Sequence, residues 1–166
     1  MQLTHEAHIK PEGSSKEIIV LCDHVKGPAN IGAIFRLSDA FGVNEIIFGG
    51  HPIDLTSSRL KRTARNTHEK VRFRESEDLQ TTLNDLHSQG YQSIAVEITL
   101  SSIPIQKINN EGLKKVVLIL GDENFGISEG ILEMATHTAH IKMLGMNSSM
   151  NVAQALGIAL YEITRS

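Results

Sequence analysis

The fold is decided by one stretch, Val116-Val117-Leu118-Ile119-Leu120 followed by Gly121-Asp122-Glu123-Asn124-Phe125-Gly126. Its first five residues have no polar side chain, which is typical of a strand buried on both faces of a parallel sheet. The two glycines allow a tight turn with close backbone approach, and Ser128 can cap the helix expected next. The stretch therefore predicts a strand, a turn and a helix, the repeating unit of an α/β fold.

Strand and helix patterns alternate along the rest of the chain. Segments rich in Val and Ile predict strands at Ile18–Cys22, Glu45–Phe48, Tyr91–Ile98, Val116–Leu120 and Ala139–Met143, with a weaker candidate at Val71–Arg74. Helices are predicted between them at Ile31–Phe41, Ser57–Arg65, Glu77–Ser88, Glu129–Ala135 and Val152–Thr164. This order predicts an α/β fold with a mostly parallel sheet and helices on both faces.

Two more polar turns stand at the starts of predicted helices. Residues 30–36 (Asn-Ile-Gly-Ala-Ile-Phe-Arg) and 147–152 (Asn-Ser-Ser-Met-Asn-Val) each follow an apolar run and lead into a helical pattern. The carboxyl ends of parallel strands meet at one edge of the sheet, where ligands bind. The three turns are therefore expected to form one site. Taken singly, each has an ordinary alternative: a capped helix with a surface arginine, a solvated acidic turn, or a helix cap.

The first of these turns has the expected geometry of an anion site. Asn30 is the predicted N-cap of its helix. Gly32 and Arg36 are four residues apart and share one helical face, with Arg36 leaning back toward the helix N-terminus. The missing side chain of Gly32 is expected to leave a gap beside the guanidinium and free backbone N–H groups. A nucleic-acid phosphate fits such a gap.

The last predicted helix has a broad apolar stripe, made of Val152, Leu156, Ala159, Leu160 and Ile163. Asn151 or a neighbouring serine is its expected N-cap. A stripe this broad must be buried, against the sheet or against a second subunit. Gly157 in its middle implies a close neighbour. No histidine lies near Ser148 and Ser149 in sequence, so a hydrolase triad gains no support.

Length and composition are those of one domain, residues 1–166, with 40% hydrophobic residues. Residues 1–15 are polar, lack periodicity and are expected to be flexible, and the first ten do not resemble a signal peptide. The apolar runs are too short to span a membrane. Cys22 is the one cysteine, which excludes an internal disulfide and predicts a cytoplasmic protein.

Basic residues are concentrated in one segment although the net charge is −3. Residues 59–74 contain seven Lys or Arg and one Glu, giving +6, and the remaining 9 basic and 18 acidic residues give −9. A local basic patch is enough to bind phosphates whatever the total charge. Within it, Lys61, Arg62 and Arg65 are the predicted RNA contacts, against the alternative of a solvated helix face.

Other chemistries lose support from the sequence. The chain has neither a Gly-x-Gly-x-x-Gly nor a Walker-type phosphate loop, which argues against dinucleotide and triphosphate sites. The pairs His5 with His8 and His137 with His140 have no cysteine partner or clear carboxylate third ligand, so no metal site is predicted. The chain has no Trp and little aromatic character, which argues against extensive base stacking.

Taken together, the three turns resemble the signature motifs of the SpoU (TrmH-like) branch of the SPOUT methyltransferase superfamily. Asn30, Gly32 and Arg36 match the first motif; Gly121, Glu123 and Gly126 match the second; Ser149, Asn151 and Val152 match the third. The resemblance runs from Val20 to Glu162. It implies a deep C-terminal trefoil knot, S-adenosylmethionine as cofactor, a homodimer, and methyl transfer to a ribose 2′-hydroxyl of RNA.

The same resemblance implies roles for individual residues. Arg36 is the implied catalytic centre, with Asn30, Glu123, Ser149 and Asn151 orienting it or the ribose. The implied cofactor-binding residues are Val96, Gly121, Ile141, Met143, Ser149 and Met150. Lys142 stands where the family usually has proline, which affects the local backbone and no implied catalytic group.

The RNA is expected to be tRNA, because a compact dimer with one basic patch can grip a small structured RNA. An rRNA substrate is the alternative. Two other kinds of protein are alternatives: a non-catalytic RNA-binding protein of the same fold, and a nucleotide-binding α/β enzyme of different chemistry. The first requires loss of the cofactor residues or of Arg36, which are present. The second lacks its phosphate-loop glycines.

Overall fold

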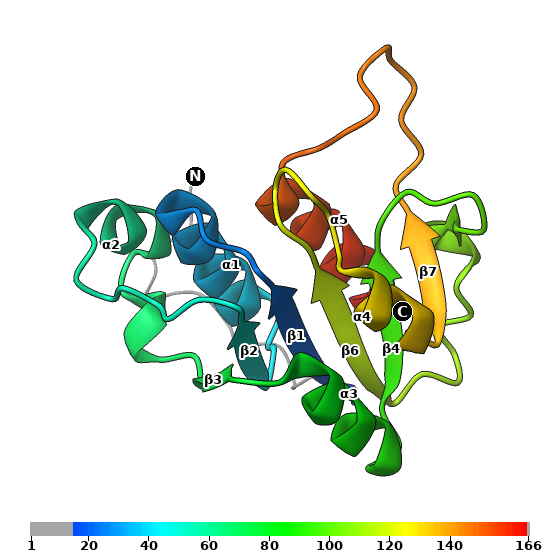
Figure 1. Cartoon of the computed structure of the whole chain (residues 1–166), viewed down its shortest axis with the longest axis horizontal. Helices are drawn as coiled ribbons and strands as arrows, with labels where there is room; N and C mark the ends of the chain where they lie inside the picture. The colour runs from blue at the N-terminus through cyan, green and yellow to red at the C-terminus, as the bar shows by residue number, and fades with distance from the viewer. Residues whose placement is uncertain (1–14, 166) are drawn as a thin grey trace, which may run out of the picture.

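The computed structural model describes residues 15–165, which form one seven-stranded sheet with strand order β3-β2-β1-β6-β4-β7-β5. Every pair of neighbouring strands is parallel, and in Figure 1 the labelled strands run toward the same edge. The strands are β1 (Glu17–Asp23), β2 (Glu45–Gly49), β3 (Phe73–Ser76), β4 (Gln92–Val96), β5 (Ile103–Pro104), β6 (Lys115–Leu120) and β7 (His137–His140).

Helices cover both faces of the sheet (Figure 1). They are α1 (Pro28–Ala40), α2 (Ser58–Ala64), α3 (Leu79–Ser88), α4 (Glu129–Met134) and α5 (Val152–Thr164), with short 3₁₀ helices η2 (Thr67–Glu69) and η3 (Ile105–Lys107). Ile18, Val20 and Cys22 of β1 belong to the core under α1, α2 and α5, whereas Ile19 and Leu21 belong to the core under α3 and α4. The α/β prediction is confirmed, and β6 is buried on both faces as expected.

The predicted elements differ from the observed ones mainly at the edge near β7. The strand expected at Tyr91–Ile98 is limited to β4, and the one expected at Ala139–Met143 is β7, which ends at His140. Residues beyond these two ends leave the sheet to line a cavity. The weak candidate at Val71–Arg74 is β3, shifted by two residues. The two-residue strand β5 was not predicted, because two residues show no period.

Asn30 is not the N-cap of α1, so that prediction is wrong. The helix begins two residues earlier, at Pro28, and Gly27 is the N-cap without a side-chain hydrogen bond. Proline is favoured in the first turn because its fixed φ suits a helix and its missing N–H would have had no partner there. The side chain of Asn30 is therefore free for contacts outside the helix. At α5 the prediction is confirmed, since Asn151 Oδ1 accepts from the N–H groups of Ala153 and Gln154 at 3.0 and 3.2 Å.

Gly32 does not leave a gap for an anion, which corrects a second prediction. A Cβ on Gly32 would collide with the carbonyl oxygen of Leu60 and, closer still, with Thr63 Oγ1, both on α2. The missing side chain is used for close packing of α2 on α1. The close neighbour expected at Gly157 exists, because Leu37 of α1 lies 3.3 Å from the position of its missing Cβ.

Some predictions concern residues outside the described range or features that the structure does not test. The expected flexibility of residues 1–15 falls, apart from Ser15, outside the described residues, as do His5 and His8. The sheet order is consistent with the trefoil knot, which stays a prediction, as does the single domain over 1–166. Among residues 15–165, no helix is both long and apolar enough to cross a membrane.

Candidate active site

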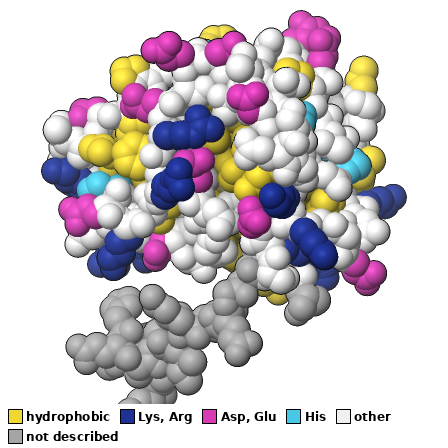
Figure 2. Space-filling view, turned by 90° about the horizontal axis from the view of Figure 1, so that it is seen from below, with side chains coloured by type: hydrophobic (Ala, Val, Ile, Leu, Met, Phe, Trp, Pro, Cys, Tyr) yellow, Lys and Arg dark blue, Asp and Glu magenta, His cyan; other side chains and the backbone are white. Residues whose placement is uncertain are grey.

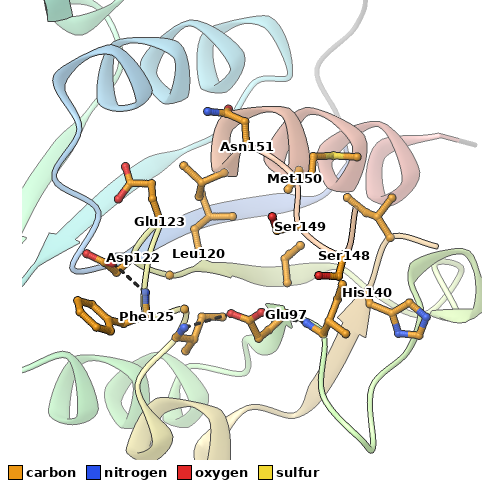
Figure 3. A pocket seen from close by; sticks show the side chains of 18 of the residues that line it. Glu97, Leu120, Asp122, Glu123, Phe125, His140, Ser148, Ser149, Met150 and Asn151 are labelled. Atoms are coloured by element: carbon orange, nitrogen blue, oxygen red, sulfur yellow. Dashed lines mark hydrogen bonds between the residues drawn. The ribbon is translucent and has the colours of Figure 1, made fainter. Parts of the chain in front are cut away.

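The three polar turns converge on one cavity at the carboxyl edge of the sheet, as predicted. Its volume is about 840 Å³, and it lies where β4, β6 and β7 end, next to the N-termini of α1 and α5. Its walls are residues 96–99, 120–127, 140, 141, 143 and 147–152, together with Asn30, Leu132 and Ala155. Figure 3 shows Glu97, Leu120, Glu123, Ser148, Ser149 and Asn151 around this space.

One hydrogen-bond network joins the three turns. Asn30 Nδ2 donates to Glu123 Oε1 at 2.8 Å, and Asn151 Nδ2 donates to Asn30 Oδ1, also at 2.8 Å. The backbone N–H of Gly27 makes a longer contact of 3.4 Å with the same Glu123 oxygen. The side-chain oxygen of Asn151 caps α5. Three predicted site residues, separated by 93 and 121 positions, are thus held together by side-chain hydrogen bonds.

The turn after β6 is rigid. The backbones of Asp122 and Gly126 exchange two hydrogen bonds, and Asp122 Oδ1 accepts from the N–H groups of Asn124 and Phe125 at 2.7 and 3.0 Å. Lys26 Nζ lies 2.9 Å from Asp122 Oδ2. The hydrogen bond from Lys26, followed by those from the backbone, lowers the pKa of the Asp122 carboxyl to about 2. Asp122, 6% exposed, is therefore a fixed anion that shapes the turn.

All six predicted cofactor-binding residues line the cavity: Val96, Gly121, Ile141, Met143, Ser149 and Met150. The turn is built for close backbone approach. A Cβ on Gly121 would lie 2.2 Å from the carbonyl carbon of Gly126, which itself has a φ of +72°. Apolar Val96, Ile141 and Met150 beside the polar turn after β6 fit a flat, polar-edged cofactor such as S-adenosylmethionine.

Glu97 is a cavity residue that sequence reasoning missed. Its Oε2 accepts from the N–H of Ile127 at 3.2 Å and its Oε1 from the N–H of Ile98 at 3.0 Å, so it ties the end of β4 to the turn after β6. A Cβ on Gly126 would lie 2.6 Å from that carboxylate. The sequence pattern predicts a strand that continues to Ile98 and so places Glu97 inside it, whereas β4 ends at Val96. The signal for Glu97 is a polar residue at the end of a strand.

Arg36 is the predicted catalytic residue that the structure does not bring into the cavity. It lies two turns into α1, is exposed, and makes no hydrogen bond or ion pair with the other residues in the range 15–165. Ser149 lines the cavity, and its Oγ donates to Asn147 Oδ1 at 3.3 Å; it makes no hydrogen bond with Glu123 or Arg36. The predicted catalytic set is therefore divided between a joined trio, a cavity serine and a separate arginine.

The basic segment is divided as well. Lys61, Arg62 and Arg65 are exposed on α2 or at its end, whereas Arg72 and Arg74 pair with Glu45 at 3.1 and 3.4 Å. Part of the +6 charge is therefore neutralised locally. Figure 1 shows α2 at the end of the sheet opposite β7, so the free cations do not border the cavity of the same chain.

No group of three or more His, Cys, Asp or Glu side chains in residues 15–165 is arranged to hold a metal ion. His137 lies on the surface, and His140 Nδ1 is 2.9 Å from Ser102 Oγ. Cys22 is buried under α1, and burial raises the pKa of its thiol far above the ordinary value. It is a core residue and not a nucleophile.

Known proteins share this sequence and fold. A model of the SpoU rRNA Methylase family matches residues 17–161. A tRNA (guanosine(18)-2′-O)-methyltransferase of Aquifex aeolicus is 30% identical over 154 residues, covering 93% of this chain and 72% of the relative. A 23S rRNA (guanosine-2′-O-)-methyltransferase of Coxiella burnetii is 28% identical over 148 residues, covering 89% of this chain and 58% of the relative.

The crystal structure of an AdoMet-bound rRNA methyltransferase from Sinorhizobium meliloti has the same fold, with a TM-score of 0.82 at 28% identity. The match covers 93% of this chain and 57% of that one. The present chain thus spans between 57% and 72% of the length of these three proteins. The family model, the shared fold and the convergence of the three motif segments agree: the chain belongs to the SpoU rRNA methylase family.

Proposed function

We propose that this protein transfers the methyl group of S-adenosylmethionine to a ribose 2′-hydroxyl of RNA. The observation that carries the proposal is the meeting of Asn30, Glu123 and Asn151 at the mouth of a cavity that the six expected cofactor residues line. The relatives named above add support, since two are RNA 2′-O-methyltransferases and one was solved with AdoMet.

The reaction needs little acid catalysis from the protein. S-adenosylmethionine supplies an activated methyl group on a sulfonium that departs neutral, so no leaving group needs a proton. The side chains must hold the hydroxyl in line and favour loss of its proton. In this proposal the joined trio positions the ribose by hydrogen bonds, and Ser149 orients groups at the cavity wall.

Arg36 has a distinct part in the proposal. A guanidinium stays protonated at any working pH, so it is a poor base. As an exposed cation without a partner in the described chain, it is suited to bind the phosphate next to the reacting ribose and to stabilise the developing alkoxide charge. It then reaches the reacting groups only when RNA is present.

The proposed RNA is tRNA, held by Lys61, Arg62 and Arg65. Among the described residues, the face at the amino ends of the strands shows no basic patch, because Figure 2 shows lysine, arginine and acidic side chains intermingled there. An rRNA substrate is the second candidate, favoured by the relative from Coxiella burnetii. The protein is proposed to act in the cytoplasm as a single domain.

A homodimer is also proposed, through the outer faces of α1 and α5. Leu156, Ala159 and Leu160 fill the core, yet Ile158 and Tyr161 on the same helix remain 37% and 62% exposed. A second copy can cover them, and a C2 pair is the commonest closed assembly. Sedimentation at micromolar concentration is expected to give twice the chain mass, and a monomer contradicts this part of the proposal.

The activity is tested by incubating the protein with labelled S-adenosylmethionine and separate pools of total tRNA and rRNA. A 2′-O-methyl group blocks the hydroxyl that attacks the phosphate in alkali, so the label is expected in alkali-resistant dinucleotides. Label in bases, or none in either pool while the cofactor binds, contradicts the proposed reaction. Label in the rRNA pool alone replaces tRNA with the second candidate.

A further inference from the structure

A second cavity lies on the other side of the Asp122–Gly126 turn from the cofactor site. Its volume is about 240 Å³, and its walls include Asp23, His24, Lys26, His51 and Phe125. Asp122, Phe125 and Gly126 border both cavities, so the rigid turn is the wall between them. None of His24, Lys26 and His51 takes part in the network of the candidate active site.

His24 is held in place by a buried carboxylate. Asp23, 1% exposed, accepts from the N–H of Ser128 at 2.7 Å and lies 2.6 Å from His24 Nδ1. This contact leaves Nε2 as the ring nitrogen available to a ligand. The backbone of His24 has a φ of +61°, a costly conformation for a residue other than glycine. A Cβ on Gly50 would lie 2.3 Å from the His24 ring, so that glycine makes room for it.

Phe125 is the aromatic side chain of this wall and is 85% exposed. Its backbone N–H is bonded to Asp122, so the ring stands on a fixed support. In Figure 3 the ring points away from the cofactor cavity. The Lys26 ammonium lies 5.9 Å from the ring centroid, which places a cation beside an exposed aromatic face. Core packing accounts for neither feature.

We propose that this second cavity binds a neighbouring nucleotide of the RNA, with its base stacked on Phe125 and its phosphate against Lys26 and His24. Stacking on an aromatic side chain is tolerant of base identity, and a nearby cation suits the backbone. The carboxylates of Asp23 and Asp122 disfavour a bare anion, so the base is an essential part of the ligand. This inference rests on RNA being the substrate of the proposed reaction.

Variants of Phe125 test the stacking directly. Binding of total tRNA and of total rRNA is measured for the wild type, Phe125→Leu, Phe125→Tyr and His24→Asn, with AdoMet affinity measured alongside. Phe125→Leu is expected to raise the RNA Kd about tenfold, whereas Phe125→Tyr retains wild-type affinity because it keeps the ring. His24→Asn removes the imidazole, and asparagine tolerates the left-handed backbone. It is expected to weaken RNA binding severalfold.

Lys107→Ala, at an exposed lysine on η3 outside both cavities, is the matched control and is expected to change nothing. AdoMet affinity should stay constant in His24→Asn and Lys107→Ala, which lie outside the cofactor cavity. If Phe125→Leu and His24→Asn bind RNA like the wild type while the wild type methylates RNA, the nucleotide site is overturned and the proposed function stands. If affinity depends on Phe125 but no RNA is methylated, the nucleotide site stands and the proposed function fails. Absence of RNA binding by the wild type overturns both.

Discussion

The two ends of the first family motif, both on α1, are built in opposite ways. Asn30, in the first turn, is tied to Glu123 and Asn151 by hydrogen bonds of 2.8 Å. Arg36, less than two turns later, is exposed and without a partner among residues 15–165. One end is fixed by side-chain hydrogen bonds, and the other faces solvent. In the proposed reaction, a single motif therefore combines a preorganised part with a part that acts only on binding RNA.

The largest effect should come from the cofactor, on the assembled side of this comparison. A ligand that binds only the native state at a hundredfold excess over its Kd stabilises it by about 2.7 kcal/mol. S-adenosylmethionine is expected to raise the melting temperature of the wild type and of Arg36→Lys equally, as read by calorimetry. No shift at saturation would remove the cofactor from the proposal, and a shift lost only in Arg36→Lys would move Arg36 to the cofactor side.

Gly32→Ala tests the glycine that lies between Asn30 and Arg36 in the motif. Its Cβ would collide with the Leu60 carbonyl oxygen, so α2 must move, and overpacking of this kind costs about 1–3 kcal/mol. Chemical denaturation should show this loss. Gly112→Ala is the control, because no atom lies within 4 Å of its added Cβ. Equal stability of the two variants would contradict the close packing of α1 and α2.

Arg36→Lys tests the open end. Lysine keeps the charge and loses the planar fork of donors. The variant is expected to fold, to bind S-adenosylmethionine like the wild type, and to methylate RNA at least tenfold more slowly in a single turnover, a loss of about 1.4 kcal/mol or more. A normal rate would mean that only charge matters. A normal rate in Arg36→Ala would transfer the catalytic role to Glu123, Ser149 or Asn151.

Asn30→Ala tests the assembled end by removing two side-chain hydrogen bonds. Each such bond contributes roughly 1 kcal/mol, and less where solvent can replace it. We expect a stability loss of about 1 kcal/mol together with slower methylation, in contrast to Arg36→Lys, which should keep full stability. Asn84→Ala, on an exposed position of α3, provides the matched control. An unchanged melting temperature in Asn30→Ala would show that the network does not stabilise the free protein.

The smallest effect per residue is expected on α2. A triple alanine variant at Lys61, Arg62 and Arg65 should bind RNA more weakly, with a salt dependence flatter by about two log–log units if each lost contact counts roughly 0.7. Cofactor affinity should not change, because these residues lie outside the cavity. Wild-type affinity and salt slope in this variant would identify α2 as a solvated helix face.

The sequence predicted the layers and the convergence of the three turns because both follow from periodicity and from the direction of parallel strands. The family resemblance named Val96, Gly121 and Met150 as cofactor-binding residues, and all three line one cavity; their role stays a prediction. The sequence could not predict the first residue of α1. Pro28 indicates the first turn of a helix and Asn30 indicates an N-cap, and the two signals lie within three residues of each other. Nor could the sequence show that α2 fills the space at Gly32. That contact joins two helices that are far apart in the sequence, and no repeating sequence pattern predicts which helices pack together.

The sequence also could not predict that Arg36 lies outside the cavity. Helical spacing put Gly32 and Arg36 on one face, which suggested a shared anion site. The structure shows that neighbours on one helix can serve different partners, α2 for Gly32 and solvent for Arg36. The sequence also did not point to Asp23 and His24. The orientation of the His24 ring depends on a left-handed backbone conformation, which a histidine in a sequence does not indicate.

The network of Asn30, Glu123 and Asn151 has a consequence for how the chain folds. Contacts between residues 93 and 121 positions apart form late, because the entropy of closing such long loops is lost before the contacts repay it. The strands from β1 to β6 can pair before α5 docks, but the trio cannot close until it does. Folding intermediates that lack a docked α5 should therefore be inactive even when most of the sheet is formed, so recovery of activity on refolding reports the last step of the folding pathway.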